Sequence, residues 1–188
     1  TMQDVITLAK ALELAGVSII NTGIGWHEAR IPTIVTSVPR AAFTRYTAAV
    51  KHAINIPVIA ANRINMPQTA EEILSSGQAD LVQMARPFLA DSDWVNKAAS
   101  NQAHLINTCI GCNQACLDHT FANQRASCLV NPLACFESEI SVKPTKKPKK
   151  IIIVGAGVAG LSAAVTAASR GHQVTIYEQH THIGGQFN

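Results

Sequence analysis

The sequence predicts an α/β protein in which helices cover parallel strands, and two observations carry that prediction. Over the first hundred residues, apolar runs that suit strands alternate with segments of helical periodicity. Later in the chain, the apolar run at 151–154 leads into GAGVAG and then into an alanine-rich segment. Strand, glycine turn and helix in that order are typical of the start of a dinucleotide-binding fold.

The first region opens with a predicted helix. Asp4 can cap its beginning, and Gly16 stands where a left-handed C-terminal cap belongs. Its apolar face consists of Val5, Leu8, Ala9 and Leu12. We expect a strand directly after it, at 17–23.

A second helix and strand follow in the middle of this region. We predict the helix at 41–54 from the spacing of Phe43, Tyr46, Val50 and Ile54. Pro57 then opens an apolar strand at 58–62.

The last pair of elements begins at Pro67, which starts a third helix that stops at Gly77. A buried strand from 79 onward runs into a loop by 89. Asp91 or Ser92 can cap one more helix, in which Trp94 packs inward; we also interpret Met66 and Met84 as packing residues.

Four of the five cysteines, Cys109, Cys112, Cys116 and Cys128, form the pattern C-x2-C-x3-C-x11-C. Three close thiolates and a fourth that returns after a loop favour a cubane 4Fe-4S cluster, whereas structural zinc more typically uses two separated C-x2-C pairs. Zinc and free thiols are the alternatives. Gly111 removes a side chain where backbone amides must approach sulfide. Cys135 lies outside the pattern, and we interpret it as a small buried residue.

The glycine-rich loop carries a dinucleotide fingerprint. Gly155 permits the tight turn, Gly157 lets the backbone approach a pyrophosphate, and Gly160 allows close packing of helix and strand. Glu178 ends the next strand, where its carboxylate can accept hydrogen bonds from ribose hydroxyls and would repel a 2′-phosphate. This favours FAD or NAD over NADP. The following GGQ at 184–186 resembles the glycine pair that follows the acid in FAD-binding reductases, and this resemblance favours FAD.

Polar residues also follow the predicted strands of the first region. His27 follows the first, Arg63 the second and Arg86 the third. Sites in parallel α/β folds lie at this edge, and two arginines that leave successive strands suit a phosphate. A lone histidine is more often structural, so position alone does not make His27 catalytic.

Composition bounds the class of protein. The formal charge of +3 owes much to the run KPTKKPKK at 143–150, which reads as a solvated linker and gives no reason to expect nucleic acid. The sequence shows no signal-peptide layout at its start and no stretch of eighteen apolar residues, so we expect a cytoplasmic protein without a membrane partner. Both ends of the pattern look interrupted, and we expect a piece of a longer chain.

The segments GWHEARIP, ANRI, MARPFLAD, CIGCNQAC and IVGAGVAGL occur in an order that closely resembles the middle of the bacterial NADPH-dependent 2,4-dienoyl-CoA reductases, old yellow enzyme-like flavoproteins. The resemblance covers essentially the whole chain, and the cysteine spacing is its most specific part. It implies the C-terminal part of an FMN-binding (β/α)8 TIM barrel at 1–103 and a 4Fe-4S segment at 104–142. The start of a Rossmann-like FAD-binding domain at 151–188 would follow the linker.

The resemblance also implies roles for single residues. His27 matches an active-site histidine that protonates substrate together with a tyrosine, which would precede residue 1. Arg63, Ala85 and Arg86 match FMN-binding positions, and the four patterned cysteines match the cluster ligands. The FAD-binding portion would contain Gly155, Ala156, Gly157, Gly160, Glu178 and Gln186.

The implied function is reduction of 2,4-dienoyl-CoA, an acyl-CoA substrate from unsaturated fatty acids, with electrons that pass from NADPH through FAD and the cluster to FMN. The NADPH site would lie beyond Asn188. The alternatives are a related enoate or enone reductase, an amine dehydrogenase, or an electron-transfer module without a substrate site. The sequence leaves the oligomeric state open.

Overall fold

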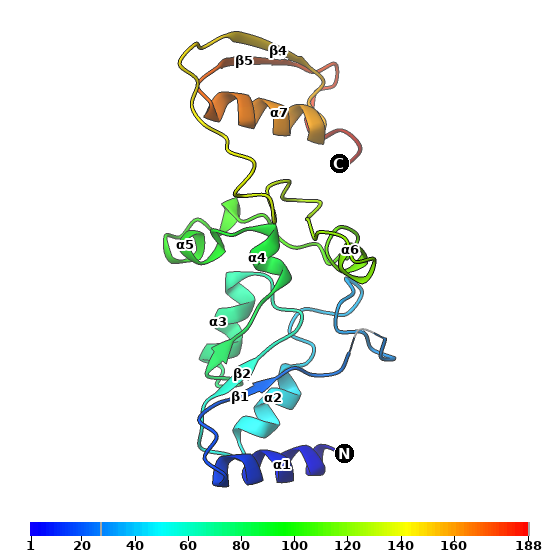
Figure 1. Ribbon diagram of the computed structural model, residues 1–188, viewed down its shortest axis with the longest axis vertical. Helices are drawn as coiled ribbons and strands as arrows, with labels where there is room; N and C mark the ends of the chain where they lie inside the picture. The colour runs from blue at the N-terminus through cyan, green and yellow to red at the C-terminus, as the bar shows by residue number, and fades with distance from the viewer. Residues whose placement is uncertain (27, 188) are drawn as a thin grey trace. The chain divides into compact units, whose positions relative to one another are not determined.

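The computed structural model describes residues 1–26 and 28–187, and its chain divides into two compact units, Thr1–Phe136 and Glu137–Asn188 (Figure 1). The first unit contains the predicted strand-and-helix region together with most of the cysteine segment. The second contains the linker and the glycine-rich loop. Each unit is described by itself below.

The first unit contains a parallel sheet with the strand order β1-β2-β3. Its strands are β1 (Ile20–Thr22), β2 (Val58–Ala60) and β3 (Leu81–Val82), with Asn21 opposite Ile59 and Val82 opposite Ala60. The parallel alternation that the sequence predicts is confirmed. The strands are shorter than predicted: β1 begins at Ile20 and not at residue 17, and β2 ends at Ala60 and not at residue 62.

Helices and short turns make up much of the rest of this unit. They are α1 (Met2–Leu14), α2 (Thr44–Lys51), α3 (Pro67–Ser75), α4 (Arg86–Ala90), α5 (Trp94–Ala99), the 3-10 turn η1 (Ala103–Leu105) and α6 (Leu117–Phe121). Pro67 begins α3, as predicted. Helix α4 was not predicted: the chain after β3 forms a short helix, with Arg86 at its first position, where we expected a loop.

The helices α1, α2 and α3 cover one face of the sheet. Val58 of β2 belongs to a buried cluster with Ala9 of α1 and Val50 of α2. Ala60, two residues further along the same strand, belongs to a cluster with Ile73 of α3. Residues two apart on a strand point to the same face. A sheet covered by helices on one face is the arrangement found in the wall of a (β/α)8 barrel, whereas a doubly wound sheet carries helices on both faces.

Two predicted caps are wrong in detail. Thr1 is the N-cap of α1, and Asp4 is its capping-box partner, because the Asp4 carboxylate reaches back to the Thr1 amine at 2.5 Å. Helix α5 has Asp93 as its N-cap, with no side-chain capping bond, and Asp91 instead lies buried beneath the helix start.

Burial confirms part of the predicted packing. Ala9 and Trp94 are buried, but the other residues of the predicted apolar face of α1, Val5, Leu8 and Leu12, are exposed, with Leu8 59% accessible. Cys135 is half-buried and not buried as predicted, and its φ of +65° places it in the left-handed region.

The second unit forms the predicted strand, turn, helix and strand. Strands β4 (Lys150–Val154) and β5 (Gln173–Tyr177) pair in parallel, and α7 (Val158–Ser169) connects them. The 3-10 turn η2 (Gly185–Phe187) follows. Within the described ranges of both units, no helix is both long enough and apolar enough to cross a membrane.

Candidate functional site

A cavity of about 180 Å³ lies at the carboxyl ends of β2 and β3. Its lining includes the three residues predicted for this edge, Arg63, Ala85 and Arg86, together with Asn65 and Cys109. We call it the arginine cavity. The structure therefore brings together residues that the sequence places on two different strands, because carboxyl ends of parallel strands meet at one edge.

The two arginines are held by backbone carbonyls. Arg63 Nε donates to the Val38 carbonyl oxygen at 2.8 Å, and Arg86 Nη1 donates to that of Ile34 at 2.8 Å. Burial and the neighbouring charge of Arg86 lower the pKa of Arg63. In the part of the chain that the structure describes, neither arginine forms an ion pair with a carboxylate. Two adjacent guanidinium groups without a carboxylate partner suit an anion such as a phosphate.

The backbone turns sharply where the chain enters the arginine cavity. Asn62 and Arg63 have φ values of +73° and +57°, a region that residues other than glycine rarely adopt. The Asn62 side chain stabilises the turn by donating from Nδ2 to the Ile24 carbonyl oxygen at 2.7 Å. Consecutive strained residues of this kind cluster at ligand-binding sites.

A second, smaller cavity of about 20 Å³ is lined by all four patterned cysteines, Cys109, Cys112, Cys116 and Cys128. We call it the cysteine cavity. All five cysteines are free thiols, and burial raises the pKa of the Cys116 thiol. The cysteine cavity has four thiols and no carboxylate or imidazole among its described lining residues, a donor set that iron–sulfur clusters and structural zinc sites share. Among residues 1–26 and 28–187, no three His, Cys, Asp or Glu side chains are gathered closely enough to hold a single metal ion.

The two cavities share residues. Arg86 and Cys109 line both of them. Arg86 Nη1 also donates to Asn113 Oδ1, and Asn113 lies between Cys112 and Cys116 in the sequence. The structure therefore places the predicted phosphate-binding edge directly beside the cysteine segment.

Side chains of the strand-and-helix region hold the start of the cysteine segment. Asn65 Nδ2 donates to the Cys109 carbonyl oxygen at 2.9 Å, and the Thr36 hydroxyl donates to that of Ile110. Gly111 has a φ of +66°, and a Cβ added there would lie 2.8 Å from Thr36 Oγ1. The glycine thus allows the segment to lie against Thr36, a contact that our prediction of close approach to sulfide did not include.

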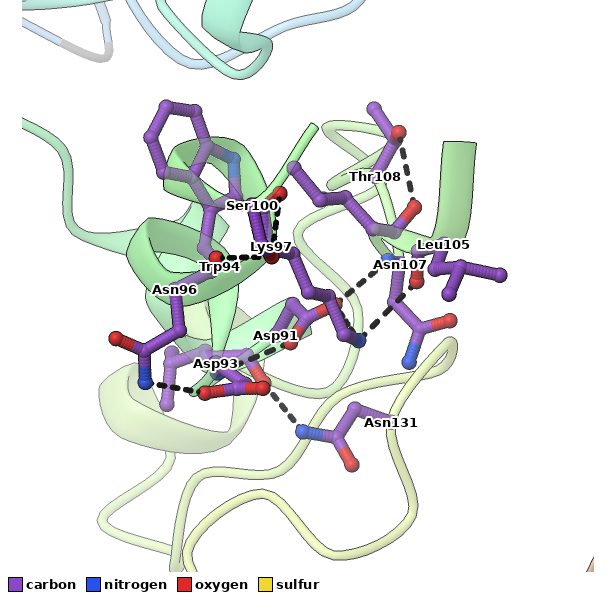
Figure 2. Close-up of polar contacts among 12 residues, drawn as sticks. Asp91, Asp93, Trp94, Asn96, Lys97, Ser100, Leu105, Asn107, Thr108 and Asn131 are labelled. Atoms are coloured by element: carbon purple, nitrogen blue, oxygen red, sulfur yellow. Dashed lines mark hydrogen bonds and ion pairs between the residues drawn. The ribbon is translucent and has the colours of Figure 1, made fainter. Parts of the chain in front are cut away.

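A buried carboxylate fixes the chain just before Cys109 (Figure 2). Asp91, 5% exposed, accepts hydrogen bonds from Lys97 Nζ at 2.6 Å, from the Asn107 backbone N–H at 2.9 Å and from the Asp93 backbone N–H at 3.0 Å. Burial alone would raise the pKa of Asp91, but the bonds from Lys97 and the two N–H groups outweigh it and lower the pKa. The charge therefore persists and joins α5 to the entry of the cysteine segment.

The glycine-rich loop of the second unit has the features that a pyrophosphate site needs. A Cβ at Gly160 would lie 2.0 Å from the Gly155 carbonyl oxygen, so helix and loop pack too closely for any side chain there. At Gly157 an added Cβ would meet nothing within 4 Å, so the space beside it is open to a ligand. These two glycines have the local surroundings that the fingerprint predicts.

Glu178 lies beside this loop. Its carboxylate accepts hydrogen bonds from the Ala156 backbone N–H at 2.7 Å and from the His180 backbone N–H at 2.9 Å, and these bonds lower its pKa. Gly184 donates from its backbone N–H to the Ala156 carbonyl oxygen at 2.8 Å, so the predicted GGQ segment contacts the loop. Gln186 itself is exposed.

The structure adds functional candidates that the sequence reasoning missed. Asn65 lines the arginine cavity, is 8% exposed, and its Oδ1 has no hydrogen-bond partner among the described residues. Asn65 could have been identified from the sequence, because it lies in the ANRIN segment after β2, close to Arg63. Asn113 and Thr36 gave no signal, since only the fold brings them to the cavities. His27, predicted as catalytic, lies outside the described residues.

The parallel strands, the arginine cavity and the glycine-rich loop define a nucleotide-binding α/β protein. Residues 1–104 match the NADH:flavin oxidoreductase / NADH oxidase family, and residues 153–188 match an NAD(P)-binding Rossmann-like domain. The chain belongs to the NADH:flavin oxidoreductase / NADH oxidase family. The broader part of the predicted resemblance, to flavin-dependent oxidoreductases, is confirmed.

Individual relatives agree with this family. The chain is 48% identical over 99% of its length to a metal reductase of Desulforamulus reducens and 40% identical over 99% to an NADH oxidase of Thermoanaerobacter brockii. A solved structure of 2-naphthoyl-CoA reductase in complex with 2-naphthoyl-CoA matches 99% of the chain at 34% identity with a TM-score of 0.94. The chain spans 28% to 29% of the length of these three proteins.

Proposed function

We propose that the chain is part of a cytoplasmic iron–sulfur flavoprotein that reduces a carbon–carbon double bond conjugated to a thioester, with 2,4-dienoyl-CoA as the predicted substrate. Arg63, Ala85, Arg86 and Asn65 would hold FMN as part of a (β/α)8 barrel. Cys109, Cys112, Cys116 and Cys128 would hold a 4Fe-4S cluster, and the glycine-rich loop with Glu178 would hold FAD.

One observation carries this proposal: Arg86 and Cys109 line both the arginine cavity and the cysteine cavity. A cluster transfers single electrons, whereas nicotinamide and substrate exchange a hydride, so flavins are needed on either side to convert one to the other. The cysteine cavity, which would hold the cluster, adjoins the arginine cavity, which would hold FMN. This matches the order that electron transfer between these two groups requires. The role of the first unit's residues would be to hold FMN and the cluster in adjoining cavities.

The nucleotide end of the proposal rests on the second unit. The open space beside Gly157 supports a pyrophosphate there, and the Glu178 carboxylate, which follows β5, would accept hydrogen bonds from ribose hydroxyls. We propose FAD here and NADPH as the electron donor at a site outside this chain.

The choice of a thioester substrate is supported by the solved relative whose title names a 2-naphthoyl-CoA complex. A second candidate is a free conjugated acid, because a cinnamate reductase of Clostridium sporogenes is 32% identical over 96% of the chain. The two candidates differ in whether coenzyme A is recognised.

The test uses the intact natural protein that contains this chain, hereafter the intact protein. It is purified without oxygen and supplied either with NADPH and 2,4-hexadienoyl-CoA or cinnamate, or with dimethylamine and an oxidised one-electron acceptor such as ferricenium. The products are identified by mass spectrometry. We expect reduction of the dienoyl thioester. Turnover of cinnamate without turnover of the thioester would favour the second candidate, and oxidation of the amine alone would overturn both.

The histidine prediction is tested in the same protein. His27→Ala should slow substrate reduction by about 10²- to 10⁴-fold, the contribution of a general acid, while NADPH reduces the bound flavin at the wild-type rate. The two steps are separated by stopped-flow absorbance. A loss of flavin reduction instead would show that His27 is structural.

A further inference from the structure

Arg86 lies at the boundary between the arginine cavity and the cysteine cavity. The Arg86 guanidinium is half-buried at the start of α4, and it contacts two partners through Nη1: the Ile34 carbonyl oxygen at 2.8 Å and the Asn113 amide oxygen. Asn113 Nδ2 donates to the same Ile34 carbonyl at 3.2 Å. The three residues form a closed hydrogen-bonded group, which fixes the guanidinium between the two cavities.

The position of Asn113 makes this contact specific to the cysteine segment. Its φ is +64°, so the chain bends there between the second and third patterned cysteines. The guanidinium is thus bonded to the loop that carries Cys112 and Cys116, and it lines the cavity that those residues share. Arg63, in comparison, is absent from the described lining of the cysteine cavity, although its Nη1 would lie 3.2 Å from a Cβ at Gly111.

The electrostatic consequence follows from Coulomb's law. Reduction of a cluster by one electron, supplied by NADPH through FAD in the proposed function, adds one negative charge and breaks no bond. A fixed positive charge beside the cavity stabilises the reduced form more than the oxidised form, because the attraction grows with the negative charge. An anion bound on the other side of the same guanidinium, such as a flavin phosphate, partly offsets that effect.

We propose that Arg86 is a positioning and tuning residue shared by the two cavities, which binds the flavin's anionic end on one side and raises the reduction potential of the cluster on the other. This inference rests on the proposed function. It adds a specific consequence: one residue sets both flavin retention and the direction of electron flow into the cluster.

The test compares three variants of the intact protein: Arg86→Gln, Arg86→Lys and Arg63→Gln. The reduction potential of the cluster is measured by titration monitored with electron paramagnetic resonance, and FMN content is measured by absorbance after release. Arg86→Gln should weaken FMN retention and lower the equilibrium constant for cluster reduction about tenfold, which is ~59 mV for one electron.

Arg86→Lys keeps the charge and should keep that equilibrium constant within about threefold of wild type, although it loses the planar fork. Arg63→Gln is the matched control for loss of a cavity charge. It should weaken FMN retention but shift cluster reduction less than Arg86→Gln does. An equal or larger shift in Arg63→Gln would overturn the specific role of Arg86.

Each remaining outcome also supports or overturns the proposed role of Arg86. A wild-type protein with no iron overturns the proposed function and this inference together. A wild-type protein with a cluster, and an Arg86→Gln variant with an unchanged potential, overturns this inference alone. Should Arg86→Gln assemble no cluster, Arg86→Lys decides: a near wild-type potential supports the charge role, and a lysine variant without a cluster shows a purely structural role.

Discussion

The cysteine segment and the glycine-rich loop are held in different ways. In the first unit, the segment is fixed by side chains from distant parts of the chain: Asn65 bonds to the Cys109 carbonyl and Arg86 to Asn113. In the second unit, the loop is fixed mainly by neighbouring backbone: the Gly155 N–H donates to the Tyr177 carbonyl at 2.7 Å, and the Gly184 N–H to that of Ala156.

This difference predicts which substitutions each site tolerates. A site built from long-range side-chain bonds is sensitive to polar substitutions far from it in sequence. A site built from close backbone packing is sensitive to any added Cβ but less so to its polar side chains.

The largest effect is expected for Cys112→Ser in the intact protein. Loss of one ligand should remove iron and reduce NADPH-driven substrate reduction more than about 100-fold, since even outer partners of metal ligands contribute about 10- to 100-fold. FMN should stay bound, because Cys112 does not line the arginine cavity.

Cys135→Ser is the matched control and should keep its iron, because Cys135 is absent from the described lining of the cysteine cavity. Iron analysis and NADPH turnover are the measurements, and normal turnover in Cys112→Ser would refute the ligand assignment.

The glycine-rich loop gives the next effect. Gly160→Ala should destabilise the second unit by about 3 kcal/mol, because its Cβ would lie 2.0 Å from the Gly155 carbonyl oxygen. Gly157→Ala, where space is open, should fold normally yet retain less FAD, since the methyl group occupies the pyrophosphate approach. Denaturant unfolding and flavin content of the intact protein measure the two effects. Equal stability of the two variants would contradict the packing difference.

The buried carboxylate of the first unit gives a somewhat smaller loss. Asp91→Asn should destabilise this unit by about 2 to 3 kcal/mol, because Lys97, whose side chain is 21% exposed, would lose its carboxylate partner and keep its bond to the Leu105 carbonyl oxygen. Asp93→Asn, at an exposed position, should change stability by less than about 0.5 kcal/mol. Thermal unfolding of the intact protein checks both variants.

The same carboxylate gives a pH dependence. The pKa of Asp91 lies below its ordinary value of 3.8 in the folded protein, so its stabilising effect is complete above that value. It is lost as the pH falls through the lowered pKa of the folded state. Asp91→Asn should therefore remove part of the acid sensitivity below pH 4. An unchanged acid transition in the variant would mean that Asp91 is not ionised in the folded protein.

The smallest effect is expected at Glu178, whose bonds lie at the edge of the glycine-rich loop. Glu178→Gln keeps one acceptor oxygen and should weaken FAD binding by roughly tenfold or less through loss of charged hydrogen bonds. FAD fluorescence on titration measures the affinity. Loss of folding in this variant would contradict the view that this loop is held mainly by backbone contacts.

The second unit was the more predictable from sequence, because its parts are local. Strand, glycine turn, helix and acid follow one another within a short segment, and each glycine has a steric reason that can be read before the fold is known. Gly160 is the clearest example, since the motif alone implies the close approach that the structure contains.

The first unit was predictable only in outline. Element types, the parallel order and the edge that carries Arg63 and Arg86 followed from periodicity and from the rule that sites lie at the carboxyl ends of strands. The roles of Asn65 and Asn113 could not be predicted, because their bonds to Cys109 and Arg86 join residues far apart in the chain. The caps at Thr1 and Asp93 are local, and the prediction misplaced them because several neighbouring polar side chains can cap the start of a helix.

The most direct test of the central claim is the iron and acid-labile sulfide content of the intact protein purified without oxygen. If the four thiols of the cysteine cavity hold a cubane cluster, the protein contains about four irons and four sulfides per chain, with FMN and FAD alongside. A protein that contains neither iron nor labile sulfide, or zinc in their place, would contradict the claim.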